Sequence, residues 1–297
     1  MGPDGGLLEV GDGHRLWVAA EGRGQPVLVL HGGPGSGCSP AMRGLFDAEK
    51  HRAIFLDQRG AGKSEPARSR QSNTTAHLVA DIEVLRQALG IEAWHVFGGS
   101  WGATLALTYA EAHPDRVRGM VLRSVFLGTS AELDWAFRTA LPAFFPAHAA
   151  ALQAVMAGGG LAALWQAILD PDPARHRPAA LAFYRAERAL SELTPAPDLP
   201  DPGAEGQCPA TPFMEAHYFA QGCFLTPDQL IRDAGRLSGI PAEIIQPLQD
   251  MLCPPATSAR LATAWPGARV TVVPGAGHSL MHPPVFEACK AALARLI

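Results

Sequence analysis

The sequence lacks the features that would assign it to several specialised classes of protein. Lysine and arginine number 24 against 28 aspartates and glutamates, so the net charge of −4 offers no electrostatic case for nucleic-acid binding. The first residues, Met1 to Gly6, contain neither the basic region nor the apolar region of a signal peptide. The five cysteines are widely spaced and include no C-x-x-C, which favours free thiols in a reducing compartment. We therefore expect a cytoplasmic protein.

Residues 149–169 carry no formal charge, and this stretch is long enough to cross a bilayer. Three glycines at 158–160 interrupt it and it contains two glutamines, so we expect two short helices joined at the glycines, and no membrane partner. Histidines, cysteines and acidic residues nowhere cluster at the spacing of metal ligands. Neither a metal nor another cofactor is therefore expected.

The sequence does contain a regular alternation of short apolar runs and helical patterns. Its length of 297 residues and its hydrophobic fraction of 47% suit one large globular unit with a substantial core. After a predicted hairpin over residues 7–10 and 15–19, strands are expected at 27–30, 53–56, 94–97, 117–122, 243–248 and 270–273. Helices are expected at 75–89, 103–110, 257–264 and 284–297. Strands that alternate with helices predict an α/β fold with a mostly parallel, doubly wound sheet.

The alternation stops after Phe126 and resumes near residue 240. Between these points the sequence is helical, rich in alanine and proline, and without a convincing buried strand. The prolines that begin at Pro195 predict a loop over residues 195–212, because proline breaks helices and central strands. We therefore predict a sheet-bearing catalytic domain of residues 1–126 and 240–297, with an inserted helical cap of residues 127–239.

A serine stands at the apex of a predicted strand, turn and helix. The strand at 94–97 runs into the sequence GGSWG, centred on Ser100, and a helix follows. The pattern G-x-S-x-G is the nucleophile elbow, a strained turn that lifts the serine hydroxyl above the edge of the sheet. Glycines flank the serine because the strand and helix backbones pass too close for Cβ atoms. Ser100 is the candidate nucleophile, and the Trp101 N–H, at the helix start, is placed to stabilise an anion.

A second glycine-rich loop follows the predicted strand at 27–30. Residues 31–35 read HGGPG, which matches the loop that supplies an oxyanion-binding N–H beside a nucleophile elbow.

Residues 60–64 resemble a phosphate-binding loop only superficially, since Asp57 stands where the first glycine of G-x-x-x-x-G-K-[ST] belongs. Nucleotide binding is therefore not expected.

An acid and a base follow the last two predicted strands. Asp250 comes after the strand at 243–248, and His278 follows the strand at 270–273 within the sequence GAGHS. The order Ser100, Asp250, His278 is that of the α/β-hydrolase triad, and open α/β sheets place their sites at these strand ends. Three rival acids are less well placed: Asp228 and Asp233 fall in the cap or its exit, and Glu243 begins its strand.

This triad predicts acyl transfer, in which the histidine takes the serine proton, the serine attacks a carbonyl, and an acyl-enzyme is hydrolysed. The residues alone leave the acyl group open. A carboxylesterase or amidase for small neutral acyl substrates uses the same triad, and an inactive binding module on this fold is a further alternative. An epoxide hydrolase or dehalogenase is disfavoured, because those enzymes carry a carboxylate at the elbow.

Several segments together resemble one family. They are residues 31–35, 57–64, 73–75, 98–107, 121–123, 215–219 and 274–279. In combination they resemble proline iminopeptidase (prolyl aminopeptidase), a serine peptidase family of the α/β-hydrolase fold. The resemblance implies release of proline from the N-terminus of short peptides. It also implies that Ser100, His278 and Asp250 are nucleophile, base and orienting acid, and that the N–H groups of Gly33 and Trp101 form the oxyanion hole.

The resemblance further implies how the substrate is held. Glu215 and Glu243 would bind the substrate's amino group, Phe126 would wall the proline pocket, and Arg123 and Tyr218 would lie beside them. The amino group of an N-terminal proline is a secondary ammonium at neutral pH. A buried cation is costly unless it is paired, and carboxylates are its natural partners.

The sequence departs from the family pattern in places. The family usually has His-Gly-Arg-Tyr before its acid, where this chain has Gln246-Pro247-Leu248-Gln249. The segment 124–129 and the cap between about Phe137 and Pro212 also differ.

Cys253 lies three residues past the acid. We expect a bulky thiol reagent to inhibit there; a buried, inert cysteine is the alternative.

Overall fold

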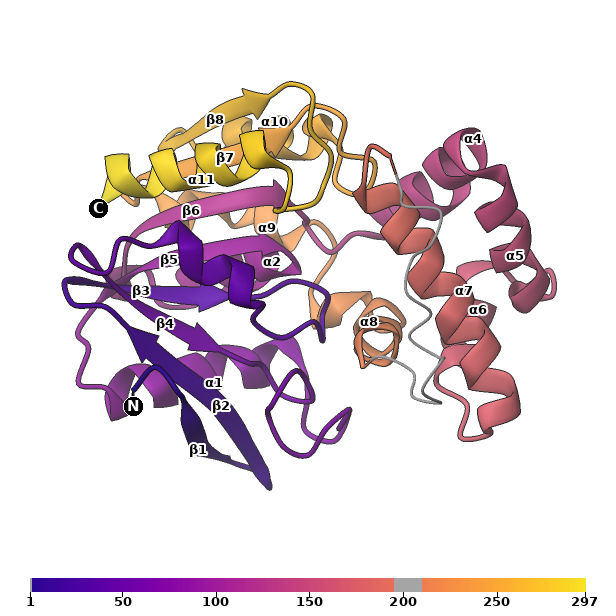
Figure 1. Ribbon diagram of the computed structural model, residues 1–297, viewed down its shortest axis with the longest axis horizontal. Coiled ribbons are helices and arrows are strands. Elements are labelled where there is room, and N and C mark those ends of the chain that lie inside the picture. The colour runs from indigo at the N-terminus through magenta and orange to yellow at the C-terminus, as the bar shows by residue number, and fades with distance from the viewer. Residues whose placement is uncertain (1, 195–209) are drawn as a thin grey trace.

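The computed structural model describes residues 2–194 and 210–297, which form an eight-stranded sheet with helices on both faces (Figure 1). The strands are β1 (Gly6–Gly11), β2 (His14–Glu21), β3 (Gln25–Leu30), β4 (His51–Leu56), β5 (Trp94–Ser100), β6 (Val117–Val125), β7 (Ala242–Pro247) and β8 (Ala268–Val273). They lie in the order β1-β2-β4-β3-β5-β6-β7-β8. The β1–β2 and β2–β4 pairs are antiparallel and the other pairs are parallel. The predicted α/β fold with a mostly parallel sheet is confirmed.

The central strands are buried on both faces, because alternate side chains point into two different cores. Leu28 and Leu30 of β3 join the core that contains α1 (Thr75–Ala88), α2 (Trp101–Ala112) and α10 (Pro255–Ala264). Val27 and Val29 face the other core, with α11 (Pro283–Leu296) and the short 3₁₀ helix η1 (Pro40–Leu45). Burial on both faces explains why the sequence of β3 is a continuous apolar run.

The expected helices and strands agree with the observed ones to within a few residues. The α1 helix starts at its predicted cap, where the Thr74 hydroxyl accepts the His77 N–H. β8 begins at Ala268 rather than at residue 270, because this edge strand is only half buried and its apolar pattern is weaker. β5 continues to Ser100, so the strand ends on the serine of the elbow.

The helices from α3 to α8, which follow β6, pack beyond the carboxyl ends of the parallel strands (Figure 1). Phe137, Leu152, Trp165 and Phe183 lie in a separate apolar core that these helices enclose. The helical character predicted for this region is confirmed. Its helices are α3 (Ser130–Asp134), the π-helical segment η3 (Trp135–Ala140), α4 (Leu141–Phe144), α5 (Pro146–Met156), α6 (Gly160–Ile168), α7 (Pro173–Ser191) and α8 (Thr211–Phe219).

The chain returns to the sheet after α8, through η4 (Gly222–Phe224), α9 (Gln229–Arg232) and η5 (Ala234–Leu237). Leu230 and Leu237 are buried in the same core as α2. The predicted boundaries of the cap, residues 127 and 239, stay predictions. Of the loop expected over 195–212, residues 195–209 lie outside the described part of the chain, and Thr211 and Pro212 already belong to α8.

Within the described residues, no single helix has both the length and the apolar character needed to cross a membrane. The pair α5 and α6 meets that test only jointly, and the two helices are bent by 72° where they join. They correspond to the two short helices expected over 149–169. A cytoplasmic location stays a prediction.

Candidate active site

Ser100 sits in a strained turn between β5 and α2. Its φ of 56° lies in the left-handed region, which a non-glycine residue adopts at a cost and which is frequent at functional sites. The flanking glycines are required by close backbone contacts: a Cβ on Gly98 would overlap the Gly102 carbonyl, and one on Gly102 would overlap the Leu30 carbonyl. The local sequence therefore produces the elbow predicted from it.

Asp250 and His278 meet at the ends of β7 and β8. His278 Nδ1 lies 2.9 Å from Asp250 Oδ2 and 3.0 Å from Oδ1. The same carboxylate accepts the N–H groups of Leu252 (3.1 Å) and Cys253 (2.8 Å). Burial alone would raise the pKa of Asp250, but the charge of His278 and these hydrogen bonds hold it below its ordinary value. Asp250 is thus an ionised partner that can fix the imidazole of His278.

The rival acids are engaged elsewhere. Asp228 forms an ion pair with Arg260 at 3.2 Å, and Asp233 pairs with Arg232 at 2.9 Å.

Arg123 donates hydrogen bonds next to the predicted acid and base. One guanidinium N–H group donates to the backbone carbonyl of His278 and, at 3.0 Å, to the hydroxyl of Ser124. Ser124 in turn helps to hold the pKa of Asp250 down. Arg123 also lines the larger cavity described below, so it lies beside the site, as expected.

The oxyanion loop is held by a residue that the sequence reasoning did not single out. Gln58 donates its backbone N–H to His31 Nε2 (3.0 Å) and its side-chain amide to the His31 carbonyl (3.0 Å). Its amide oxygen accepts the indole N–H of Trp101 at 2.8 Å. One side chain therefore ties the loop that carries Gly33 to the start of α2, where the second predicted oxyanion donor lies.

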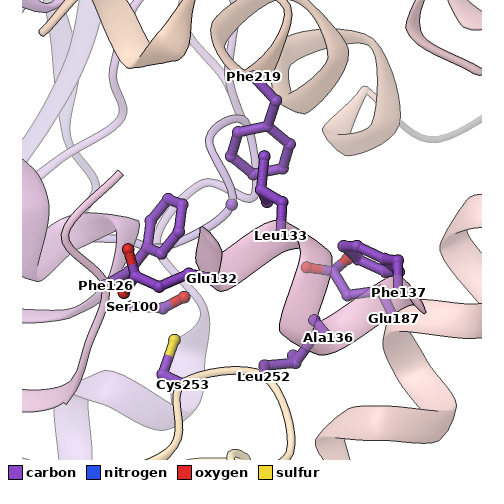
Figure 2. Close-up of a pocket in the computed structure, with 11 residues that line it drawn as sticks. Ser100, Phe126, Glu132, Leu133, Ala136, Phe137, Glu187, Phe219, Leu252 and Cys253 are labelled. Atoms are coloured by element: carbon purple, nitrogen blue, oxygen red, sulfur yellow. The ribbon is translucent and has the colours of Figure 1, made fainter. Parts of the chain in front are cut away.

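Two cavities meet at Ser100. The smaller, about 30 Å³, lies under the cap and is mostly apolar (Figure 2). The larger, about 670 Å³, lies between the loop after β3, α7 and residues 278–281. Gly33, Ser100 and Glu187 line both. Ser100, the predicted nucleophile, thus lies between a small apolar compartment and a larger one of mixed polarity. The apolar walls of the smaller cavity are Phe126, Leu133, Ala136, Phe137, Phe219 and Leu252.

Glu215 lies in α8 and is completely buried, and neither of its carboxylate oxygens receives a hydrogen bond from the described residues. Its polar neighbour is the carboxylate of Glu187, which comes from α7 and faces the cavities. Burial, and then the charge of Glu187, raise the pKa of Glu215 well above its ordinary value. Two neighbouring carboxylates can share a proton. Glu187 lines both cavities and Glu215 lines neither, so a cation in the cavity meets Glu187 first.

The structure does not bring Glu243 to this place. Glu243 stands near the start of β7, at the opposite end of the strand from Asp250, and pairs with Arg295 of α11 at 2.8 Å. It lines neither cavity at Ser100. The expected role of Glu243 fails geometrically, because the carboxyl ends of parallel strands face the site and their first residues do not.

The two predicted aromatic residues lie in different places. Phe126 lines the small cavity and packs edge-on against Phe219 with ring centres 5.7 Å apart (Figure 2). Tyr218 is buried and lines neither cavity; its ring packs against Trp101 at a tilt, with ring centres 4.7 Å apart, and its hydroxyl donates to Asn73 at 2.7 Å. Phe126 is therefore placed to touch a substrate, whereas Tyr218 supports the start of α2.

Cys253 forms part of the wall beside Ser100 (Figure 2). Ser100 and Cys253 line the same cavity. Burial, and then the charge of Asp250, raise the pKa of this thiol well above its ordinary value. Cys253 is thus protonated at neutral pH and is a weak nucleophile.

Comparison with known proteins places the chain in a family. A model described as the alpha/beta hydrolase fold matches residues 25–283. A proline iminopeptidase of Xylella fastidiosa (strain Temecula1) is 42% identical over 294 residues, covering 96% of this chain and 94% of that protein. The chain belongs to the proline iminopeptidase family. The proline iminopeptidase of Arabidopsis thaliana is 37% identical and covers 94% of this chain and 76% of its own length.

Among solved structures, the proline iminopeptidase of Mycobacterium smegmatis has the same fold as this member of the family. The TM-score is 0.67 at 23% identity, over 98% of this chain and 96% of that one. The family resemblance and the α/β-hydrolase fold inferred from the sequence are therefore confirmed.

Proposed function

We propose that this chain is a serine aminopeptidase that releases proline from the N-terminus of short peptides. The observation that carries the proposal is the buried carboxyl of Glu215, which has no hydrogen-bond donor among the described residues and neighbours Glu187 in the cavity wall at Ser100. An esterase for neutral acyl groups gains nothing from a carboxylate without a donor, because burying such a group is costly. A site for a free ammonium needs one. The names of the relatives, proline iminopeptidases, support the same substrate.

In the proposed reaction His278 Nε2 takes the Ser100 proton while the serine oxygen attacks the carbonyl of the N-terminal residue. For this step the hydroxyl points towards His278. The developing oxyanion is held by the N–H groups of Gly33 and Trp101. The imidazolium then protonates the leaving amine, a prolyl-serine ester remains, and water activated by His278 hydrolyses it to free proline.

The two cavities suit the two halves of such a substrate. The proline ring is small and apolar, so it matches the walls Phe126, Phe137 and Phe219 of the smaller compartment, which has to widen from about 30 Å³ to admit it. Its ammonium then points to Glu187, with Glu215 behind. The rest of the peptide leaves through the larger cavity, between α7 and the histidine loop.

Steady-state kinetics on four chromogenic substrates test the proposal: prolyl, alanyl and acetyl-prolyl p-nitroanilides, and p-nitrophenyl acetate. We expect the highest kcat/KM for the prolyl anilide. Acetylation removes the cation, and loss of one partner of a buried charge pair costs about 2–5 kcal/mol, so the acetylated substrate should be at least about tenfold worse. Equal values for the free and acetylated prolyl substrates would overturn the aminopeptidase and favour the amidase or esterase.

A further inference from the structure

The loop that carries His278 is attached to the cap as well as to the sheet. The backbone N–H of Ser279 donates to the carbonyl of Ser191, the last residue of α7, at 3.1 Å. Glu192 follows Ser191, and its Oε2 lies 2.9 Å from Nε2 of His282. The end of α7 thus contacts the histidine loop at two positions, Ser279 and His282.

His282 links Glu192 to Gly277, the residue that directly precedes His278. Its Nδ1 accepts the backbone N–H of Gly277 at 2.9 Å. An N–H can donate only to a nitrogen with a free lone pair, so Nε2 carries the proton and donates to Glu192. The neutral ring therefore connects Glu192 to Gly277, directly before His278.

The connection is tight and partly shielded from water. Only 17% of the His282 side chain and 21% of the Glu192 side chain are exposed. Glu192 is itself oriented by Arg188, one turn earlier on α7, at 2.9 Å. A Cβ on Gly277 would lie 3.1 Å from the His282 ring and 3.3 Å from the Ser191 carbonyl, so the loop backbone packs directly on both.

The same helix faces the substrate. Glu187 precedes Ser191 by one turn of α7 and lines both cavities at Ser100. The helix that presents the amine-binding carboxylate therefore also fixes the loop of the general base. A displacement of about 1 Å at a catalytic group can cost on the order of a hundredfold in rate, so such a support has consequences for turnover.

We propose that Glu192 and His282 are positioning residues that lock the His278 loop onto the end of α7 and thereby set the imidazole against Ser100. The proposal rests on the role of His278 as base in the proposed function. Neither residue lines the small cavity, and the pair acts through Gly277 rather than on the substrate. Its loss should therefore lower kcat and leave KM nearly unchanged.

Two conservative substitutions separate the two halves of the connection. The amide oxygen of asparagine lies near the position of histidine Nδ1, so His282→Asn keeps an acceptor for Gly277 and loses Glu192. The amide nitrogen of glutamine lies near Nε2, so His282→Gln keeps a donor for Glu192 and loses the acceptor. Glu192→Gln retains an oxygen that accepts the neutral ring N–H, whereas Glu192→Ala and His282→Ala retain nothing.

The experiment measures kcat and KM on prolyl p-nitroanilide and the second-order rate of Ser100 labelling by a fluorophosphonate. We expect Glu192→Ala and His282→Ala each to lower kcat and the labelling rate by at least about tenfold, with KM within about threefold. The double variant should be no worse than either single one, because the two residues act as one connection. Glu192→Gln should recover most of the rate, and His282→Asn and His282→Gln should both fall below wild type.

Asp134→Ala is the matched control. It removes the ion pair between Asp134 and Arg138 of the cap, which has the same i,i+4 spacing as the pair of Arg188 with Glu192. It should leave kcat unchanged. Wild-type kcat and labelling rates in Glu192→Ala and both His282 amide variants would overturn the proposal. His278→Ala distinguishes this failure from that of the triad: if it is inactive while the pair variants are fully active, only the positioning role is wrong.

Discussion

Glu187 and Glu215 come from two different helices of the cap and lie next to each other, and Glu187 lines both cavities at Ser100. Glu215 has no hydrogen-bond donor among the described residues and is completely buried. Burial, and then the charge of Glu187, raise the pKa of Glu215 well above its ordinary value. An ammonium group that pairs with these carboxylates favours their ionised form, so we expect substrate binding to release a proton.

Replacing the orienting acid should nearly abolish turnover. In Asp250→Asn the side chain no longer fixes the imidazole tautomer of His278, and in the best-studied triad such a change costs about 10⁴ in kcat. Asp228→Asn, which changes an exposed carboxylate paired with Arg260, is the control and should retain the wild-type rate. Single-turnover rates check the prediction. A loss of less than about tenfold in Asp250→Asn would mean that another group orients His278.

Gln58 should matter for rate rather than for binding. Gln58→Ala releases both the oxyanion loop and the Trp101 indole, so the two N–H donors lose their fixed separation. Deleting one such donor outright costs about 10²–10³ in kcat, and loosening the pair should cost at least about tenfold. Gln25→Ala, which removes an exposed glutamine bonded to Arg118, should have no effect on kcat. An unchanged kcat in Gln58→Ala would show that the loop holds its shape without it.

Modification of Cys253 by a bulky mercurial should inhibit, because the reagent would fill the cavity wall beside Ser100. The raised pKa predicts slow reaction with iodoacetamide at neutral pH. Cys253→Ala should be active and resistant, whereas Cys289→Ala, which changes a buried cysteine of α11, should stay sensitive. Mass spectrometry would report the labelled site. Full activity after stoichiometric labelling of Cys253 would contradict the prediction.

The stability of the protein should depend on pH through Glu111 at the end of α2. Burial raises its pKa to about 7, and its Oε1 has no donor among the described residues. The unfolded carboxyl has a pKa of about 4.3, so the folded state holds the proton more tightly. This contribution is complete below the unfolded pKa and is lost as pH rises through about 7.

Glu111→Gln has no such proton, so it isolates the effect. Between about pH 4.5 and 8 the unfolding free energy of the wild type should fall by about 1–3 kcal/mol relative to the variant. Urea unfolding at several pH values measures this difference. Glu92→Gln, a change at an exposed carboxylate, should follow the wild type. A difference between wild type and Glu111→Gln that does not vary with pH would refute the shifted pKa.

The sequence alone predicts those parts of the site whose positions follow from local turn and strand patterns. Ser100 is marked by the glycines of a turn, and Asp250 and His278 each follow a strand whose carboxyl end faces the site. The amine-binding pair depends on how cap helices pack, which no local pattern records. Glu243 was chosen because it lies near Asp250 in sequence, but six residues of extended strand carry it to the other end of the sheet.

The sequence pattern around Glu187 becomes informative only once the fold is known. It follows buried Phe183 by one helical turn, which puts it on the inward face of α7. That face becomes meaningful once α7 is known to lie over Ser100. Gln58 was overlooked for a similar reason, since its neighbours His31 and Trp101 are distant in sequence and adjacent only in the folded chain.

The central claim, that Glu187 and Glu215 recognise a free N-terminal ammonium, is tested most directly by one ratio. It is kcat/KM for prolyl p-nitroanilide divided by kcat/KM for acetyl-prolyl p-nitroanilide, measured in wild type, Glu187→Gln, Glu215→Gln and Glu243→Gln. Loss of one partner of a buried charge pair costs about 2–5 kcal/mol, so the first two variants should lower the ratio by at least about tenfold. Glu243→Gln should match wild type, because Glu243 pairs with Arg295 away from both cavities. A wild-type ratio in both Glu187→Gln and Glu215→Gln would contradict the account.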